Sequence, residues 1–389
     1  MNNRLFLKKL VNVLLANLVC SFCILPVFAD GVMVEGSNLA NLPTQNNSQA
    51  VKNLLEKQDE QNGEKHIEIV PDKSNIKILA KTKEMCGVIE PIWYDAFQQA
   101  YIAQPNLYGN FYMNDIFSTY DTFVYIHEGM PVSMLTLMPT SLTLNDGKKV
   151  EGYYVYAVGT KNEYKGNGII TLMLDYIDEY AKANGKEFRI LIPDKRYNWL
   201  YNFYQKRGYE YVYYREVVIT PEQMAAFAEG ATTMICQDWL NENDLKNCRK
   251  VNYCKNTEFV EWEERELEKI QKEYRLPYKN YNVLYFGDWQ YAIVEVGNQP
   301  TSNVIRVKEF NIKEENKKAF INTLYSKFNG KTFVFEMPDA DCYTNFFAGD
   351  YNGQNLYYSR KILAMVNFKG CESLKSKIIK PIYFNFGLD

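Results

Sequence analysis

The sequence predicts an α+β protein in which a mixed, mostly antiparallel sheet is flanked by helices. Three observations lead to this prediction. Short runs rich in aromatic and β-branched residues alternate with turns in the first half of the chain, as in a series of hairpins. One of these runs, 153–158, leads through a glycine-containing loop into a segment with helical periodicity, 169–180. Part of the C-terminal half repeats the spacing of this unit, which indicates a second, degenerate α+β domain.

The length and composition are those of a globular protein with more than one domain. The chain has 389 residues, of which 47% are hydrophobic and 23% charged, and its formal net charge is −3. No run of like charges is long enough to form a nucleic-acid-binding arm, so we expect no nucleic-acid partner. The two histidines, His66 and His127, leave little room for a zinc site or a Ser–His–Asp triad, and we expect no metal.

The cysteines do not form a metal-binding or thioredoxin-type motif. Two of the eight lie in the apolar N-terminal run, and the other six show no C-x-x-C spacing. These six are Cys86, Cys236, Cys248, Cys254, Cys342 and Cys371. Their even number permits disulfides in an oxidising compartment, while buried free thiols are the alternative that we favour.

Residues 1–29 have the layout of a secretory signal peptide. Three cationic residues are followed by an apolar run, 10–25, which ends in a Val-x-Ala sequence before Asp30. An uncleaved anchor is the alternative, although the run is barely long enough to span a bilayer. We therefore expect export, or attachment to the membrane through this segment alone, with a cytoplasmic location as the alternative.

The next segment, 30–80, is predicted to be a disordered linker. It is rich in Asn, Gln, Ser, Glu and Lys and has few aromatic residues, so it cannot bury enough apolar surface to offset chain entropy. Beyond it, helical spacing of apolar residues predicts helices over 91–103 and 108–117. Strands are expected over 122–126, 132–137 and 141–144, with turns at 127–131 and 145–147. His127 should therefore lie at an exposed hairpin turn.

The strand 153–158 and the helix that begins at Ile169 are joined by a loop suited to anion binding. The loop holds Gly166 and Gly168 immediately before the helix, and Lys165 adds a nearby cation. Glycines allow the backbone to approach a ligand closely, and the free N–H groups and dipole of a helix N-terminus favour negative charge. A Gly-x-Gly before a helix is a weak signal alone, because many such sequences are simply tight turns.

The elements that follow make the pattern specific. A strand over 188–192 precedes a helix over 197–207, which ends at Gly208, and a strand pair over 209–218 completes the unit. Over roughly residues 90–220 this order resembles the GNAT superfamily of N-acetyltransferases. Three sequences carry the resemblance: Tyr156-Ala-Val-Gly-Thr160, Tyr164-Lys-Gly-Asn-Gly-Ile169 and Leu200-Tyr-Asn-Phe-Tyr-Gln-Lys-Arg-Gly-Tyr209. The resemblance implies a GNAT domain over 81–220.

The resemblance also implies a binding site for acetyl-CoA as the cosubstrate. The pyrophosphate would be held by the backbone N–H groups of Lys165, Gly166, Asn167, Gly168 and Ile169. Main-chain groups of Val158 and Thr160 would pair with the pantetheine arm, and Tyr204 would protonate the departing thiolate. The sequence departs from the family where Glu163 replaces the usual Gln or Arg, and where Lys165 replaces the commoner Arg. The family's Asn before the last helix has Asn198 as its nearest counterpart, about one position away.

The C-terminal half, 230–389, contains a shorter match to the first. Asn329-Gly-Lys-x-Phe333, followed by Pro338-Asp339, repeats the spacing of Asn184-Gly-Lys-x-Phe188 and Pro193-Asp194. The counterpart of the glycine loop, Asn311–Glu315, has no glycine and carries two carboxylates, so we expect no nucleotide there. Residues 304–336 should nonetheless form a strand, a helix and a strand, like 153–192. For the whole chain, Eis-like and clostridial-type GNAT proteins with a C-terminal extension are the nearest resemblance.

The function that this resemblance implies is acetyl transfer from acetyl-CoA to the amine of a small molecule or peptide. A backbone N–H near Val158 would polarise the thioester carbonyl, and the base that deprotonates the amine is Glu128, Glu151, the C-terminal carboxylate of Asp389, or water. For Tyr204, packing in the core is the alternative to catalysis. Two other functions stay open: an exported, non-catalytic binding protein built on tandem GNAT folds, and an aminoacyl transferase of the peptidoglycan-crosslinking kind.

Overall fold

The computed structural model describes residues 66–97, 105–238, 241–253, 257–276, 280–296, 303–339, 345–347, 356, 358–378 and 382–384. The expected signal peptide, 1–29, and most of the expected linker lie outside these residues. The end of the linker prediction is corrected, because residues 66–80 contain a 3-10 turn, η1 (Lys73–Asn75), and a strand, β1 (Ile76–Ile78), that pairs with β2. Apolar residues alternate too briefly in this segment for a strand to stand out in the sequence.

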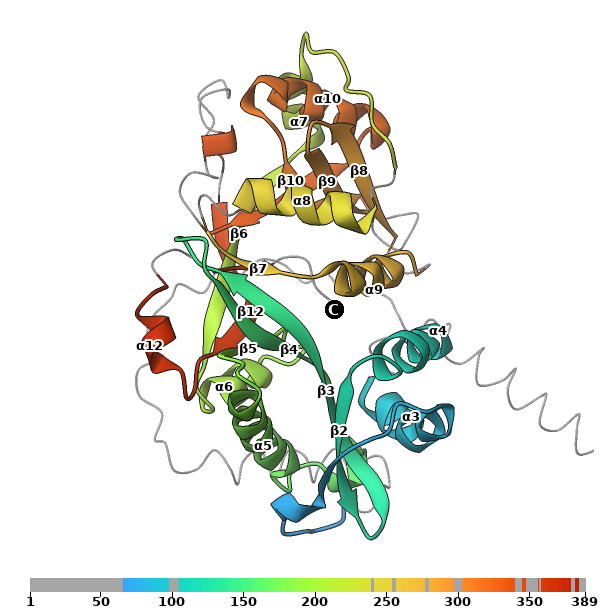
Figure 1. The fold of residues 1–389 in the computed structure, drawn as a ribbon. Coiled ribbons are helices and arrows are strands. Elements are labelled where there is room, and N and C mark those ends of the chain that lie inside the picture. Colours follow the sequence, from blue (N-terminus) through green and yellow to red (C-terminus); the bar gives the residue numbers. More distant parts are fainter. Residues whose placement is uncertain are drawn as a thin grey trace, which may run out of the picture. The chain divides into compact units, whose positions relative to one another are not determined.

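The first half of the chain forms the predicted hairpins and the strand–loop–helix unit (Figure 1). Its helices are α3 (Lys83–Phe97), α4 (Pro105–Phe111), the π-helix η2 (Tyr112–Phe117), η3 (Asn162–Tyr164), α5 (Ile169–Ala183) and α6 (Trp199–Gln205). Its strands are β2 (Asp121–His127), β3 (Met130–Thr143), β4 (Lys149–Thr160), β5 (Phe188–Leu191) and β6 (Tyr209–Ile219). Strands β2, β3 and β4 are antiparallel neighbours, whereas β4 and β5 are parallel.

Helices cover both faces of this part of the sheet. α5 packs on one face through Ile169, Met173 and Ile177, which share a buried cluster with side chains of β2, β3 and β4. α3 and η2 pack on the other face, where Trp93 and Tyr112 belong to a second cluster. The sheet is therefore covered by α5 on one face and by α3 and η2 on the other.

Three boundaries differ from the sequence predictions. Pro91 lies inside α3 and does not begin it, so the helix starts at Lys83 and not at residue 91, while residues 98–103 of the expected helix lie outside the described residues. The expected strands 132–137 and 141–144 are one strand, β3, which is buried along nearly its whole length. The expected strand pair over 209–218 is likewise the single strand β6, because its partners come from distant parts of the chain.

The second half repeats the layout of the first. Strands β8 (Tyr281–Gly287), β9 (Gln290–Val296) and β10 (Val304–Asn311) are antiparallel neighbours, and β10 runs parallel to β11 (Thr332–Pro338). Between β10 and β11 lie η4 (Glu314–Asn316) and α10 (Lys317–Lys327). The predicted strand–helix–strand order over 304–336 is confirmed by these elements.

The two halves share one sheet, in which each half gives a strand to the other. Among the described residues, thirteen strands are connected, and eleven follow the order β1-β2-β3-β4-β5-β12-β6-β11-β10-β9-β8. β12 (Tyr358–Asn367) comes from the second half but pairs with β5, and β6 comes from the first half but pairs with β11. β12 and β6 also pair with each other. The expected boundary between residues 220 and 230 therefore does not separate two sheets.

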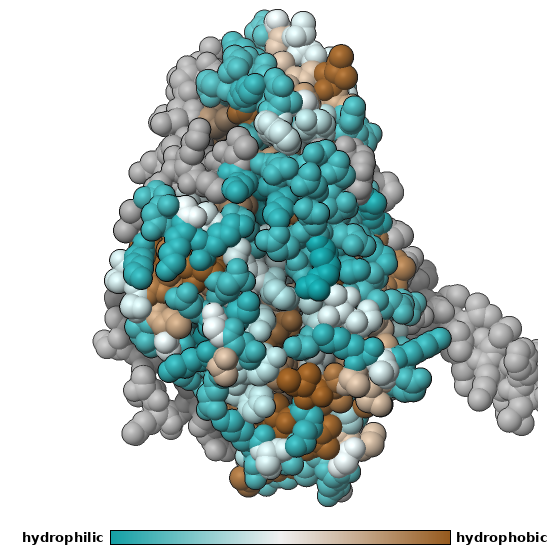
Figure 2. Space-filling model, viewed as in Figure 1, coloured by the Kyte–Doolittle hydropathy of each residue, from teal (hydrophilic) through white to brown (hydrophobic). Residues whose placement is uncertain are grey.

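The remaining described elements are five helical segments and the last two strands of this sheet. They are α7 (Pro221–Ala228), α8 (Glu242–Tyr253), β7 (Glu258–Glu261), α9 (Glu264–Tyr274), η5 (Asn345–Phe347), α12 (Glu372–Lys375) and β13 (Ile382–Tyr383). β7 pairs with β3 and with β13, so the second half also contacts the first at this edge. No helix in the described part of the chain is long and apolar enough to cross a membrane. Figure 2 shows hydrophilic residues over most of one face, with hydrophobic residues in separate patches.

Candidate active site

The C-terminal end of β4 is bulged next to the glycine loop. The pairing of β3 with β4 shifts register between Met134 and Thr136, whose partners are Gly159 and Tyr156. Ala157 lies within this irregularity and has a φ of 52°, a left-handed conformation that is uncommon for a residue with a side chain. Such strained residues are concentrated at ligand-binding and active sites. The residues of β4 alone give no signal for this bulge, because it depends on how the strand pairs with β3.

The bulged end of β4 also has an open edge. β5 pairs with β4 only at residues 152–154, so among the described strands none pairs with residues 155–160 on that side. Lys161 donates its backbone N–H to Val132 of β3 (2.9 Å). Because backbone groups of alternate residues point to opposite edges of a strand, those of Val158 and Thr160 face the open edge. This is the arrangement that an added, strand-like ligand requires.

Position 159 has room only for a glycine, because α3 packs close to the backbone there. A Cβ built on it would lie 2.7 Å from the Cβ of Ala96, so α3 approaches the backbone of β4 too closely for any side chain. α3 is thereby held against the strand one residue from Val158.

The loop after β4 presents backbone N–H groups at the start of α5. Gly166 and Gly168 have φ values of 84° and 78°, and a Cβ on Gly168 would meet no atom within 4 Å. The first intrahelical bond runs from the N–H of Leu172 to the carbonyl of Gly168 (3.1 Å), and no hydrogen bond in the described structure uses the N–H groups of residues 166–169. Four N–H groups are thus available to an anion at a helix N-terminus.

Lys165 differs from its four neighbours. Its backbone N–H donates to the carbonyl of Asn162 (3.1 Å) and closes the 3-10 turn η3, so this predicted ligand is already engaged. Its side-chain ammonium donates to the side-chain oxygen of Asn162. Lys165 therefore contributes charge beside the loop, whereas the free N–H groups begin at Gly166.

Tyr204 lies on α6, on the face of the sheet that α5 covers. It is 5% exposed and belongs to the buried cluster that contains Ile169 of α5 and Val155 of β4, with Val158 packed against it. Its ring contacts that of Tyr209, with the ring centroids 5.5 Å apart. Burial raises the pKa of the Tyr204 phenol well above its usual range, which the charge of Arg207 offsets in part. The phenol therefore stays protonated at neutral pH, as a proton donor must.

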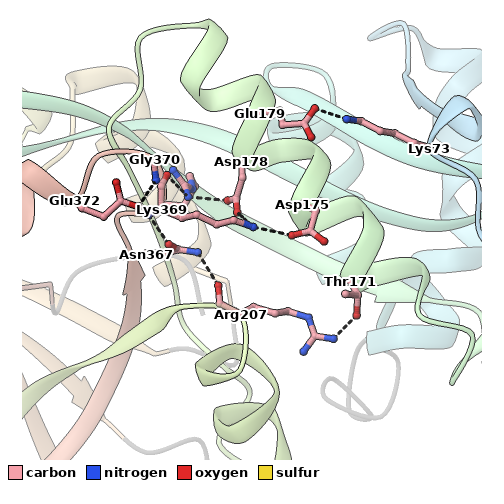
Figure 3. A network of polar contacts seen from close by, with 11 residues as sticks. Lys73, Thr171, Asp175, Asp178, Glu179, Arg207, Asn367, Lys369, Gly370 and Glu372 are labelled. Atoms are coloured by element: carbon pink, nitrogen blue, oxygen red, sulfur yellow. Dashed lines mark hydrogen bonds and ion pairs between the residues drawn. The ribbon is translucent and has the colours of Figure 1, made fainter.

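Polar contacts fix α6 and β12 to α5 (Figure 3). The Arg207 guanidinium, stacked 3.6 Å from the ring centroid of Phe203, donates to the hydroxyl of Thr171 in the first turn of α5. The turn after β12 is held in the same way, because the ammonium of Lys369 lies 2.8 Å from Asp175 and 3.2 Å from Asp178. The helix whose N-terminus carries the loop is thus fastened by the end of α6 and by a strand from the second half.

The opposite face of β4 is lined by aromatic side chains from both halves. Tyr156 stands next to the bulge, is half-buried, and lies 6.2 Å from the ring of Tyr112. Tyr154 contacts Trp262 and Phe384, with ring centroids 5.6 and 5.5 Å away. At the bulge, β4 therefore has α5 on one face and a cluster of aromatic side chains on the other.

The structure does not bring the two described candidate bases to the bulge. Glu128 is exposed at the β2–β3 turn, and the strand β3 from Met130 to Leu135 separates this turn from the bulge by about 17 Å. Glu151 is exposed near the start of β4, roughly 20 Å along the strand from Ala157, and pairs with Lys186 (3.2 Å). Asp389 lies outside the described residues. His127 was expected at an exposed turn but is the half-buried last residue of β2, one position before that turn, and its ring contacts that of Tyr164 (5.6 Å).

In the described ranges, no set of three or more His, Cys, Asp and Glu side chains is arranged to hold a metal ion. The four described cysteines, Cys86, Cys236, Cys248 and Cys371, are free thiols, whereas Cys254 and Cys342 lie outside those ranges.

Comparisons with known proteins agree with this geometry. Residues 79–212 match the family model described as an acetyltransferase (GNAT) domain. No curated protein matches the sequence. A probable N-acyltransferase from Enterococcus faecalis is similar in structure, with a TM-score of 0.60 and 14% identity over 78% of this chain and 74% of that one.

Two further solved structures are similar over most of the chain. A GCN5-related N-acetyltransferase from Anabaena variabilis has a TM-score of 0.57 at 13% identity, over 75% of this chain and 72% of that one. Eis1 from Mycobacterium abscessus has a TM-score of 0.57 at 12% identity, over 78% and 75%. The predicted resemblance and fold class are confirmed: residues 79–212 form an acetyltransferase domain of the GNAT superfamily, in a chain with the fold of solved GNAT proteins.

Proposed function

We propose that this protein transfers an acetyl group from acetyl-CoA to the amine of a small molecule or peptide. One observation carries the proposal: the open, bulged end of β4 leads directly into a loop with free N–H groups at the N-terminus of α5. An extended ligand with an anionic end matches both parts, since its arm can pair with Val158 and Thr160 while its phosphates accept from residues 166–169. The pantetheine and pyrophosphate of acetyl-CoA have this chemistry, and its thioester supplies an activated acetyl group.

Different residues of the chain can then carry out the separate steps of the reaction. The backbone N–H of Val158 or its neighbour at the bulge would donate to the carbonyl oxygen as negative charge develops there. The acceptor must be a neutral amine, so its ammonium, with a pKa near ~10, gives its proton to water or to a carboxylate. As the new C–N bond forms and the C–S bond breaks, the Tyr204 hydroxyl gives its proton to the sulfur. The attacking nitrogen loses its own proton to water, and water returns a proton to Tyr204, so the enzyme ends the cycle unchanged. The products are an N-acetyl amide and a free thiol.

The glycine loop provides the test of ligand binding. We expect the double variant Gly166→Ala/Gly168→Ala to lose most of its affinity for acetyl-CoA, because methyl groups would stand at the surface that the phosphates approach and positive φ angles would be strained. Gly185→Ala is the matched control, since Gly185 has a φ of 67°, equally open surroundings, and lies at the other end of α5. Calorimetry with acetyl-CoA measures the difference. Equal affinities in the two folded variants would refute the assignment of this loop.

Tyr204 provides the test of the chemical step. Tyr204→Phe keeps the packing and removes the proton, so kcat should fall by about 100-fold or more while the Kd for acetyl-CoA stays unchanged. An acetyl thioester with a more acidic thiol should lose much less, because its sulfur needs no proton to leave. Tyr201→Phe, on the same helix, is the control. A Tyr204→Phe enzyme with normal kcat would leave Tyr204 with a packing role only.

The N-terminal segment favours one competing function. Because residues 1–29 predict export and acetyl-CoA is a cytoplasmic metabolite, a non-catalytic, exported binding protein is the second candidate. Titration of the wild-type chain with acetyl-CoA separates the two, since the second candidate requires no binding. N-terminal sequencing of the natively expressed protein tests export: a mature N-terminus at Asp30 supports it, and an intact Met1 in the cytosolic fraction opposes it. The aminoacyl-transferase alternative would not need the intact glycine loop.

A further inference from the structure

The glycine loop is held in place by a segment that precedes the GNAT domain. The backbone N–H of Ile67 donates to the carbonyl of Glu163 (2.8 Å). The side-chain amide of Asn167 donates to the carbonyl of Ile67 (2.8 Å), and its oxygen accepts from the N–H of Ile69 (3.0 Å). Residues 67–69 therefore pair with the loop as an edge strand would, with Asn167 taking the place of a backbone. The residues matched by the family model begin only at residue 79.

Asn167 also braces the loop from within. Its amide donates a second bond to the carbonyl of Tyr164 (3.0 Å), and its neighbours on both sides are glycines with positive φ. Without these side-chain bonds, the glycines on either side of Asn167 would allow the free loop many conformations, and this freedom would be lost when a ligand binds. The side chain of Asn167 is thus committed to the protein, while its backbone N–H stays available.

The segment is anchored beyond its contact with the loop. Lys73 pairs with Glu179 in the third turn of α5, and the N–H of Asp72 donates to the hydroxyl of Tyr125 (3.1 Å). β1 then joins the sheet beside β2. Figure 1 shows this segment in blue next to α5 and β2. Residues 67–78 therefore run along α5 from its N-terminal loop and are fixed to the sheet at their far end.

We propose that residues 67–69 are a strap that holds the glycine loop in its ligand-binding conformation, with Asn167 as the positioning residue. The inference rests on the proposed binding of acetyl-CoA by this loop. A loop that is already ordered loses less conformational entropy on binding, so the strap raises affinity without touching the ligand. It also makes the affinity for acetyl-CoA depend on residues that precede the segment matched by the family model, 79–212.

Single substitutions in the full chain can remove the strap's bonds one at a time. Ile67→Pro and Ile69→Pro each remove one donated N–H, and Asn167→Ala removes the side-chain bonds while keeping the backbone N–H. We expect each variant to bind acetyl-CoA about 5- to 10-fold more weakly, because each loses at least one of the hydrogen bonds that order the loop. Val70→Ala is the control, because Val70 is 93% exposed and lies next to the strap. Calorimetry gives the affinities.

A second measurement needs no ligand. Hydrogen exchange of the loop peptide, residues 163–169, should be faster in the three strap variants than in the wild type and the Val70→Ala control. Faster exchange together with weaker binding supports the strap, whereas unchanged exchange, or affinities within twofold of the wild type, overturns it. If the wild type itself binds no acetyl-CoA, the proposed function fails, and exchange alone then decides whether residues 67–69 order the loop.

Discussion

Met365 offers a direct test of the strand exchange between the halves. It lies in the middle of β12, is 0% exposed, and is paired with Leu191 of β5 on one side and Tyr211 of β6 on the other. Its side chain belongs to the same buried cluster as Ile169 and Met173 of α5. Met365→Ala should therefore leave a cavity beneath the helix that carries the glycine loop, although residue 365 is far away in sequence.

The expected loss is about 2–5 kcal/mol in the free energy of unfolding, the usual cost of truncating a fully buried methionine to alanine. This is a large part of the roughly 5–15 kcal/mol that stabilises a typical protein. Lys361→Ala is the control in the same strand, because Lys361 is exposed and its loss should change stability by about 0.5 kcal/mol or less. Urea denaturation followed by fluorescence and circular dichroism measures both variants.

Hydrogen exchange shows which elements of the structure lose stability in Met365→Ala. If β12 belongs to the first half's sheet, Met365→Ala should speed exchange in α5, 169–183, as well as in β12 itself. If the halves were independent domains, α5 would keep its wild-type protection while the second half loosened. That second result, or equal stability of Met365→Ala and Lys361→Ala, would refute the strand exchange.

Two further predictions concern buried polar groups. Arg249→Met leaves the buried carboxylate of Glu309 without the guanidinium that lies 2.8 Å away, so the free energy of unfolding should fall by about 3–5 kcal/mol. The double variant Arg249→Met/Glu309→Leu has no buried charge at this position and should recover most of that loss. Urea denaturation measures both variants, and equal losses would contradict the reasoning. Burial raises the pKa of Tyr112 to about 12, against 10 for the exposed phenol. Because the unfolded chain releases this proton at a lower pH than the folded chain, the contribution of the phenol to folding stability is complete below pH 10. It is lost as the pH rises from 10 to 12, by up to about 2.7 kcal/mol. Unfolding measured at pH 8 and pH 11 should therefore show a smaller fall for Tyr112→Phe than for the wild type, and equal falls would count against the raised pKa.

Local patterns made the first half predictable. The helix α5 was expected from apolar residues at helical spacing after Gly168, and β2 and β3 from alternating residues around a glycine turn. These elements are encoded by residues close together in the chain. The loop N–H groups follow from the same local pattern, except at Lys165, where the bond to Asn162 depends on the turn that Glu163 and Tyr164 adopt.

Features made by distant residues were not predictable in this way. The sequence of β12 does not show that it pairs with β5, because pairing is decided by the whole sheet and not by the strand's own residues. The conformation of Ala157 depends on the register of β3 opposite it. Residues 67–69 were assigned to the linker because the segment 30–80 as a whole is polar, and only the side chain of Asn167, about 100 residues away, reveals their role.

The strand exchange explains how the second half can matter to the site without repeating its chemistry. The counterpart of the β4 bulge, at Val307 to Glu309 of β10, is kept, but Glu309 is buried there against Arg249 and the hydroxyl of Tyr291. The counterpart of the glycine loop is closed as well, because the N–H of Lys313 donates to the side chain of Gln290 (3.0 Å). The positions that correspond to the candidate site are therefore occupied by internal contacts in the second half, while β12 lies between β5 and β6. The second half contributes to the first half's site through the strand and the Lys369 turn that support α5, so it cannot be removed as a spare domain.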